Sequence, residues 1–264
     1  MNASSTIDLV QAKSDAVQAY MMHHMMDSRS WTVLPHLHQE LPFHLTVNGV
    51  MVLLTVLVLI VTLTLTCRRM PAVPSGFLNA VEFFVQYIRD EIVVPFLGHE
   101  DGPRMTPVFC SFFFFVVTMN LLSLIPCFYT PTANLGVTGA VALVTFVFMT
   151  VGAIHKNGIK AFMKGFATPG LPFALQFVIV PLEIISMFIR VMALAIRLFA
   201  NMLSGHLVLF YLLGLVVMFG VWALPAFGVA LAIYLLEVFV AFLQAYIFTL
   251  LSAVFIGERY HSAH

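Results

Sequence analysis

The residues from Leu171 to Val217 form the stretch "LPFALQFVIVPLEIISMFIRVMALAIRLFANMLSGHLVLFYLLGLVV", which decides the fold. Nearly all of its side chains are apolar, and about 20 such residues are enough for a helix to cross a bilayer. The stretch is too long for one perpendicular span, so we expect a helix that is tilted or bent. A second overlong apolar run, residues 226–256, follows it. The sequence therefore predicts a hairpin of two long membrane helices.

The composition of the whole chain agrees with a membrane location. Of its 264 residues 61% are hydrophobic and only 9% are charged, and the mean hydropathy is +1.00. These values lie far outside the range of soluble proteins and indicate an integral membrane protein. Twelve basic and twelve acidic side chains cancel, so no charge excess favours a nucleic acid as partner. The three cysteines are far apart and predict no disulfide framework or metal site.

We expect an all-α polytopic membrane protein with about five transmembrane helices and one amphipathic helix in the interface. An N-terminal segment over residues 1–44, on the extracytoplasmic side, is expected to precede a membrane domain over 45–264. The interfacial helix is predicted at 75–97, because four polar residues recur there at spacings of three, four and three on one face. The expected transmembrane helices cover 45–67, 106–126, 136–154, 171–217 and 226–256. The polar stripe consists of Asn79, Glu82, Gln86 and Arg89.

Lysine and arginine predict the orientation, because they accumulate on the cytoplasmic side of short loops. The loop 127–134 and the turn 219–225 contain neither residue type. The basic residues at the other segment ends fit one topology, with the N-terminus outside and the C-terminus inside. They are Arg68, Arg69, Arg104, Lys156, Lys160, Lys164 and Arg259.

Charged residues inside the two long helices are few, and each predicts a function. A charge at mid-bilayer costs from about 3 kcal/mol to well over 10 kcal/mol, depending on the method. The segment 171–257 nevertheless contains four charged residues, one histidine and the polar residues Asn201 and Gln244. The charged residues and the histidine are Glu183, Arg190, Arg197, Glu237 and His206.

The spacing of these residues separates two groups. Glu183, Arg190 and Arg197 are seven residues apart and share one helix face, which Asn201 continues, whereas His206 lies on the opposite side. The alternative to a functional role is a structural ion pair between Glu183 and Arg190, and we expect two helical turns to be too long for their direct contact.

The last helix has a polar face of its own. Tyr234, Glu237, Ala241 and Gln244 share that face. If the two long helices are antiparallel neighbours, His206 and Glu237 meet at one end, while Glu183 and Arg190 lie at the other. A carboxylate can load and release protons, but arginine keeps its proton in proteins. Arg197 is therefore expected to act as a barrier between two proton pockets.

Four blocks of this sequence resemble the a-subunit family of the membrane sector of F-type ATP synthases. The first, "EIISMFIRVMALAIRLFANMLSGH" at 183–206, is similar to that family's signature around "RLFxNM". The others are "NLLSLIP" at 120–126, "PTANLGVTGAVAL" from Pro131, and "LEVFVAFLQAYIFTLLSAVFIGE" near the C-terminus. Val191 and Ala193 depart from the proline and serine that many bacterial members have there.

The resemblance implies a non-catalytic stator subunit that couples proton flow to rotation of a ring of c subunits. It implies that Arg197 faces the ring carboxylate and that Glu183 belongs to a half-channel from the inner side. Arg190, at the same end of the helix pair, is also expected in the proton pathway. It implies no cofactor, and as partners the c-ring, a b-type peripheral stalk, the remaining F1Fo subunits, lipid and protons. The expected location is the bacterial plasma membrane, with the mitochondrial inner membrane as the alternative. The remaining residues implied for the proton pathway are Asn134, Asn201, His206, Glu237 and Gln244.

Three other interpretations compete with this one. A self-contained secondary transporter or channel would also use intramembrane charges. An intramembrane hydrolase would use Ser204 or Ser186 as nucleophile with His206 as base, but residues two apart on a helix do not face each other. The N-terminal histidines suggest a metal site, although their loose spacing favours a solvated segment. These histidines are His23, His24, His36, His38 and His44.

Overall fold

The computed structural model describes residues 12, 15, 30–34, 37–40, 46–68, 76–125, 128–166 and 173–261. Within these residues, five helices are long and apolar enough to cross a membrane. This confirms the predicted all-α polytopic membrane fold. The candidate spans are Val47–Thr66, Phe77–Ser123, Leu135–Asn157, Leu175–Val216 and Leu224–Tyr260.

A short β-hairpin precedes the helices and was not predicted from the sequence. Strand β1 (Ser30–Leu34) pairs with strand β2 (Leu37–Glu40) in antiparallel register, and the pairing is irregular between Thr32 and Leu34. Of the N-terminal histidines only the backbone of His38, in β2, belongs to the described residues. The possible metal site there lies outside what the structure describes.

The first long helix, α2 (Val47–Cys67), contains no charged residue. It begins at Thr46, whose hydroxyl accepts a hydrogen bond from the Gly49 N–H at 3.3 Å, as is usual for an N-cap threonine. Val47 and Met51, in its first turns, pack against the buried ring of Tyr129. Its remaining length exposes large aliphatic side chains, which suits a lipid-facing helix.

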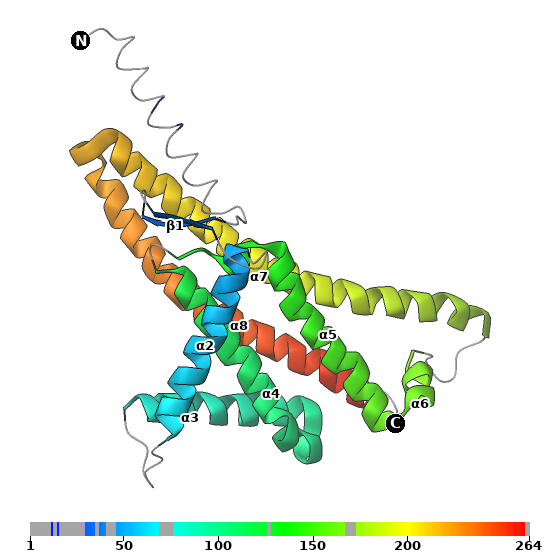
Figure 1. Cartoon of the computed structure of the whole chain (residues 1–264). Coiled ribbons are helices and arrows are strands. Elements are labelled where there is room, and N and C mark those ends of the chain that lie inside the picture. The colour runs from blue at the N-terminus through cyan, green and yellow to red at the C-terminus, as the bar shows by residue number, and fades with distance from the viewer. Residues whose placement is uncertain are drawn as a thin grey trace.

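The next segment runs across the bundle before it turns into a span. Helix α3 (Phe77–Tyr87) continues through a π-helical segment, η2 (Ile88–Val93), into α4 (Val94–Ser123). The backbone bends at Gly98, whose φ of 82° is a conformation that glycine adopts readily. Figure 1 shows α3 lying across the ends of α2 and α4. The backbone is not helical at Gly98, so a break at this residue separates the crossing segment from the span that follows.

The last two long helices, α7 (Phe173–Phe219) and α8 (Leu224–His261), are joined by one 3₁₀ turn, η4 (Gly220–Ala223). Figure 1 shows that they lie antiparallel beside this turn and then diverge. Helix α5 (Leu135–Asn157) packs against both of them. The short helix α6 (Ile159–Lys164) follows α5, and a 3₁₀ turn, η3 (Pro131–Ala133), precedes it.

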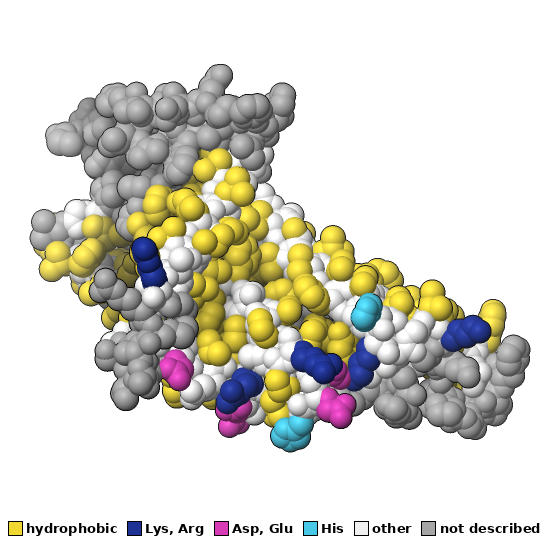
Figure 2. Space-filling view, turned by 60° about the horizontal axis from the view of Figure 1, so that its bottom comes forward, with side chains coloured by type: hydrophobic (Ala, Val, Ile, Leu, Met, Phe, Trp, Pro, Cys, Tyr) yellow, Lys and Arg dark blue, Asp and Glu magenta, His cyan; other side chains and the backbone are white. Residues whose placement is uncertain are grey.

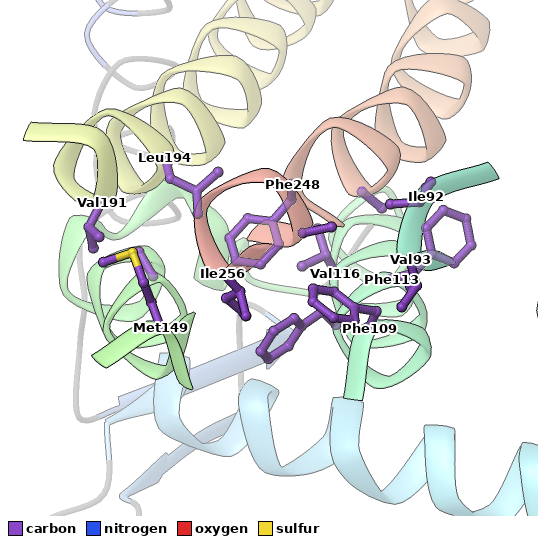
Figure 3. Packing of buried hydrophobic residues seen from close by; sticks show 14 of the residues in the cluster. Ile92, Val93, Phe109, Phe113, Val116, Met149, Val191, Leu194, Phe248 and Ile256 are labelled. Carbon is purple, nitrogen blue, oxygen red and sulfur yellow. The ribbon is translucent and has the colours of Figure 1, made fainter. Parts of the chain in front are cut away.

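The buried core lies where α4, α5, α7 and α8 meet (Figure 3). The Phe112 ring of α4 makes edge-to-face contacts with Phe148 of α5 and Phe248 of α8. Helix association in lipid depends on such close packing, because the surrounding acyl chains are as apolar as the side chains. The core thus fixes the parts of α7 and α8 that hold the polar residues.

Charged side chains gather along one edge of the molecule (Figure 2). An ion pair between Lys156 and Asp101 joins the last turn of α5 to α4, and Arg259 of α8 pairs with Glu183 of α7. We call this the Arg259 end. The opposite end contains η3, Asn134 and η4, and we call it the Asn134 end.

Candidate functional site

A buried acid and a buried imidazole face each other near the Asn134 end. His206 of α7 is 8% exposed and Glu237 of α8 is 6% exposed. The His206 Nδ1 lies 3.8 Å from the Glu237 Oε1. On the other side of the ring, His206 Nε2 lies 3.1 Å from the backbone oxygen of Ser123 in α4. Three helices therefore hold this pair in place.

The contact with Ser123 restricts the protonation states of the pair. A carbonyl oxygen only accepts hydrogen bonds, so Nε2 is the protonated nitrogen that donates to it. The Nδ1 that faces Glu237 then carries a proton only when the ring is an imidazolium. At 3.8 Å, Nδ1 and the carboxylate can share one exchangeable proton after a small movement. The pair has the composition of a proton-transfer site, and its 3.8 Å separation is longer than a hydrogen bond.

Gly205 makes the close approach of Glu237 possible. A Cβ atom at position 205 would lie 2.2 Å from the Glu237 Oε1, a distance that real side chains do not reach. Glycine next to His206 thus leaves room on α7 for the carboxylate of α8.

Several buried polar side-chain atoms have no hydrogen-bond partner among the described residues. Both carboxylate oxygens of Glu237 and the Nδ1 of His206 belong to this group. So do the side-chain amide of Asn120 in α4 and the hydroxyl of Thr132 in η3, two residues with 0% exposure. Buried polar groups are almost always hydrogen-bonded, commonly to ordered water. Asn120 and Thr132 are candidate site residues that the sequence analysis missed.

Asn201 and Gln244 connect α7 to α8 nearer the middle of the helices. The Asn201 Nδ2 donates to the Gln244 Oε1 at 3.4 Å. Gln244 is buried, and its Nε2 has no partner among the described residues. The predicted polar faces of the two helices thus meet at this pair.

Arg197 lies one turn from Asn201, on the surface of α7. Its side chain is exposed, and no described residue forms a hydrogen bond or ion pair with it. His206 is buried in the bundle, so the two residues occupy different sides of the helix, as their spacing indicates. The exposed residues nearest to Arg197 on its face, Ala193, Ala200 and Ser204, are small, and the larger Val208 follows one turn further on.

At the Arg259 end, four charged residues form one network between α7 and α8. The Arg259 Nη2 donates to the Glu183 Oε1 at 2.7 Å, and the Arg190 Nη1 donates to the Glu258 Oε2. The Arg190 Nη2 also lies 4.0 Å from the Glu183 Oε1. The expectation that two helical turns keep Glu183 and Arg190 apart was therefore wrong, because the long arginine side chain reaches back along the helix.

Asn134 has a structural contact that the sequence analysis did not predict. Its side-chain oxygen accepts a hydrogen bond from the Gly136 N–H at 2.8 Å and caps α5. No contact described in the structure joins Asn134 to His206 or Glu237. Its part in a proton pathway stays a prediction.

The site offers proton exchange and fixed charge. Among the described residues, no three His, Cys, Asp or Glu side chains gather as metal ligands. Ser204 is exposed and donates to the backbone oxygen of Asn201 at 3.0 Å, whereas His206 is buried. The serine and the imidazole thus lie on different sides of α7, which gives the hydrolase interpretation no support.

The fold and the site together define a multi-pass membrane protein in which two long helices contain buried titratable side chains and permanently charged ones. Residues 49–257 match the family model described as ATP synthase A chain, and the chain belongs to this family.

Curated relatives named ATP synthase subunit a agree with this assignment. The protein from Myxococcus xanthus is 42% identical over 229 residues, which cover 85% of this chain and 75% of the relative. The protein from Anaeromyxobacter dehalogenans (strain 2CP-C) is 43% identical over 219 residues, which cover 80% of this chain and 57% of the relative. A relative from Chlorobaculum tepidum, named ATP synthase subunit a 2, is 37% identical over 254 residues, which cover 90% of this chain and 71% of the relative.

Proposed function

We propose that this chain is the stator subunit of a rotary ATP synthase and guides protons to and from a rotating ring of c subunits. The observation on which this proposal mainly rests is the position of Arg197. It is an exposed guanidinium in the middle of a membrane helix, with a proton-exchanging pair toward one end of the helix and a carboxylate toward the other. This positive charge implies an acidic partner in the membrane, since an unpaired charge is costly there.

The surface around Arg197 suits a neighbouring helix. Ala193, Ala200 and Ser204 are small, and small residues let two membrane helices approach closely. A c-subunit helix with a carboxylate at this level would meet the guanidinium directly. The b-type peripheral stalk and the remaining F1Fo subunits are the other partners that this assignment implies.

A proton would enter from the Asn134 end, which we assign to the outer side. His206 and Glu237 pass it to a ring carboxylate, with water bound by the buried polar groups of Asn120, Thr132 and Gln244 completing the path. The neutral ring site can then turn into lipid.

The proton would leave near Glu183, which we place on the inner side. When the protonated ring site returns, the fixed charge of Arg197 favours release of its proton, and the same charge blocks a direct path between the two pockets. The membrane potential supplies about 2.3 kcal/mol per charge per 100 mV, and several protons are needed for each ATP. The N-terminus would face the outside of a bacterial plasma membrane and the C-terminus the cytoplasm.

Phosphoryl transfer is assigned to partner subunits, and this chain to the role of a non-catalytic, proton-translocating subunit. The sequence contains no GxxxxGK[ST] motif, the phosphate-binding loop of many nucleotide-hydrolysing proteins.

Reconstitution tests this proposal against a self-contained channel. The purified chain is placed in lipid vesicles, alone or with a c-ring, and proton uptake is driven by a potassium diffusion potential. We expect uptake only when the ring is present, because Arg197 interrupts the path within the chain. Equal uptake by the chain alone would favour the channel.

A further inference from the structure

Glu183 is held at the Arg259 end by a buried cation from another helix. Arg259 is 3% exposed, whereas the Glu183 side chain is 29% exposed. Surface ion pairs usually join two mobile, exposed side chains and stabilise little. Here the arginine is buried and the carboxylate remains accessible. The arginine can therefore hold the carboxylate in one position without covering it.

Three contacts fix the position of Arg259. Its guanidinium carbon lies 4.4 Å from the centre of the Phe166 ring, within cation–π distance. The Asn157 side-chain amide, at the end of α5, donates to the backbone oxygens of Arg259 at 3.4 Å and Tyr260 at 3.2 Å. Both the backbone and the guanidinium of Arg259 are therefore held by other elements.

The geometry of the carboxylate leaves one oxygen available. Arg259 and Arg190 both approach the Oε1 of Glu183, at 2.7 Å and 4.0 Å. No hydrogen bond from a described residue to the other oxygen, Oε2, is present. Arg190 itself is bound by Glu258, so the four side chains balance in charge. Glu183 is thus held by one oxygen, and the other can accept a proton.

The charged residues in the network around Glu183 come from the two long helices. Glu258 and Arg259 of α8 and Arg190 of α7 are the charged partners described above. The last turn of α5 adds His155 and Lys156, and Lys156 pairs with Asp101 of α4.

We propose that Arg259 is the positioning residue of Glu183, which it fixes by one carboxylate oxygen so that the other is presented to protons leaving the ring. This inference rests on the proposed function, in which Glu183 belongs to the inner half-channel. The inference adds Arg259 to the residues that act on the proton pathway. Arg259 lies in the last turns of α8, after the polar residues Glu237 and Gln244.

The experiment measures proton flux through the ring-bound protein in vesicles stripped of the catalytic subunits, per assembled complex. Arg259→Gln is expected to lower the flux at least about threefold, close to the effect of Glu183→Gln. The double variant Glu183→Gln/Arg259→Gln is expected to equal Glu183→Gln alone, because Arg259 acts through Glu183. Lys156→Gln, which breaks another ion pair at the same end, is the matched control and should stay near the wild-type flux.

A conservative variant keeps the test decisive if Arg259→Gln does not assemble. Arg259→Lys retains the positive charge but not the guanidinium that places the Glu183 carboxylate. It should therefore lower the proton flux partly when Glu183 is present. In a chain that already carries Glu183→Gln it should cause no further loss. Equal fractional losses in both chains would assign Arg259 a merely structural role and overturn the inference. Wild-type flux in Arg259→Gln beside reduced flux in Glu183→Gln would also overturn it while leaving the proposed function intact. Wild-type flux in Glu183→Gln would instead refute the inner pathway of the proposed function.

Discussion

The two ends of the α7–α8 pair contain the same kinds of side chain in opposite arrangements. Near the Asn134 end, Glu237 is buried, and no described residue bonds to its oxygens. At the Arg259 end, Glu183 is partly exposed and held by an arginine at 2.7 Å. The Asn134 end therefore holds its acid in the interior beside an imidazole, whereas the Arg259 end holds its acid near the surface against a guanidinium. One helix pair thus places its two carboxylates in different surroundings, and the proposed proton pathway uses both of them.

Arg197 separates these two arrangements, and its removal should have the largest effect. We expect Arg197→Ala to abolish coupled ATP synthesis and to permit passive proton leak, because the fixed charge between the pockets is gone. ATP synthesis and proton leak of the whole complex in inverted vesicles measure both effects. Arg104→Ala, which removes an exposed arginine from α4, is the control. Intact ATP synthesis in Arg197→Ala would refute the assigned role.

Glu237→Gln tests the Asn134 end alone. The amide keeps the shape of the side chain but cannot exchange a proton with His206, so proton flux should fall about tenfold or more. Binding of the c-ring should not change. Ser204→Ala, a small change at the same level of α7, should keep the wild-type flux. Wild-type flux in Glu237→Gln with the ring bound would remove the half-channel assignment.

Gly205→Ala should have a smaller effect through the same residue. The new methyl group would lie 2.2 Å from the Glu237 Oε1, so the carboxylate must move away from its position beside His206. We expect a loss of flux of about threefold to tenfold. Adding Glu237→Asp, which shortens the side chain, should recover part of it.

Gly139→Ala is the matched control for that prediction. A Cβ at position 139 of α5 meets no atom within 4 Å, so this variant should behave as the wild type. If Gly205→Ala and Gly139→Ala have the same flux and the same thermal stability, the packing of Glu237 against α7 is not what positions it.

Much of the fold could be predicted because the length of the apolar segments alone decides it. A bilayer requires long helices with internally bonded backbones, so runs such as 45–67 leave few alternatives. The pairing of His206 with Glu237 also followed from helical spacing together with an antiparallel hairpin. The sharp turn at Gly98 could not be predicted, since its positive φ breaks the helix and sets the angle between the crossing segment and the span that follows.

The missed site residues have no distinctive sequence signal. Arg259 follows the last apolar run and is indistinguishable from an ordinary loop-flanking arginine until α8 is seen to continue and bury it. Asn120 and Thr132 are single uncharged polar residues whose importance lies in complete burial without a partner. Burial of that kind depends on which helices pack together, and one sequence does not contain that information.

The crossing helix α3 has a mechanical consequence. The Phe84 ring stacks on Phe242 at a centroid distance of 6.3 Å, and the Tyr87 ring lies 6.2 Å from Tyr246. These contacts join α8 to a helix that runs across the bundle instead of along it (Figure 1). A sideways force on α8 would be transmitted to α3 and distributed over a larger area of the membrane interface. We therefore expect the molecule to resist tilting in the membrane when a force acts sideways on α8.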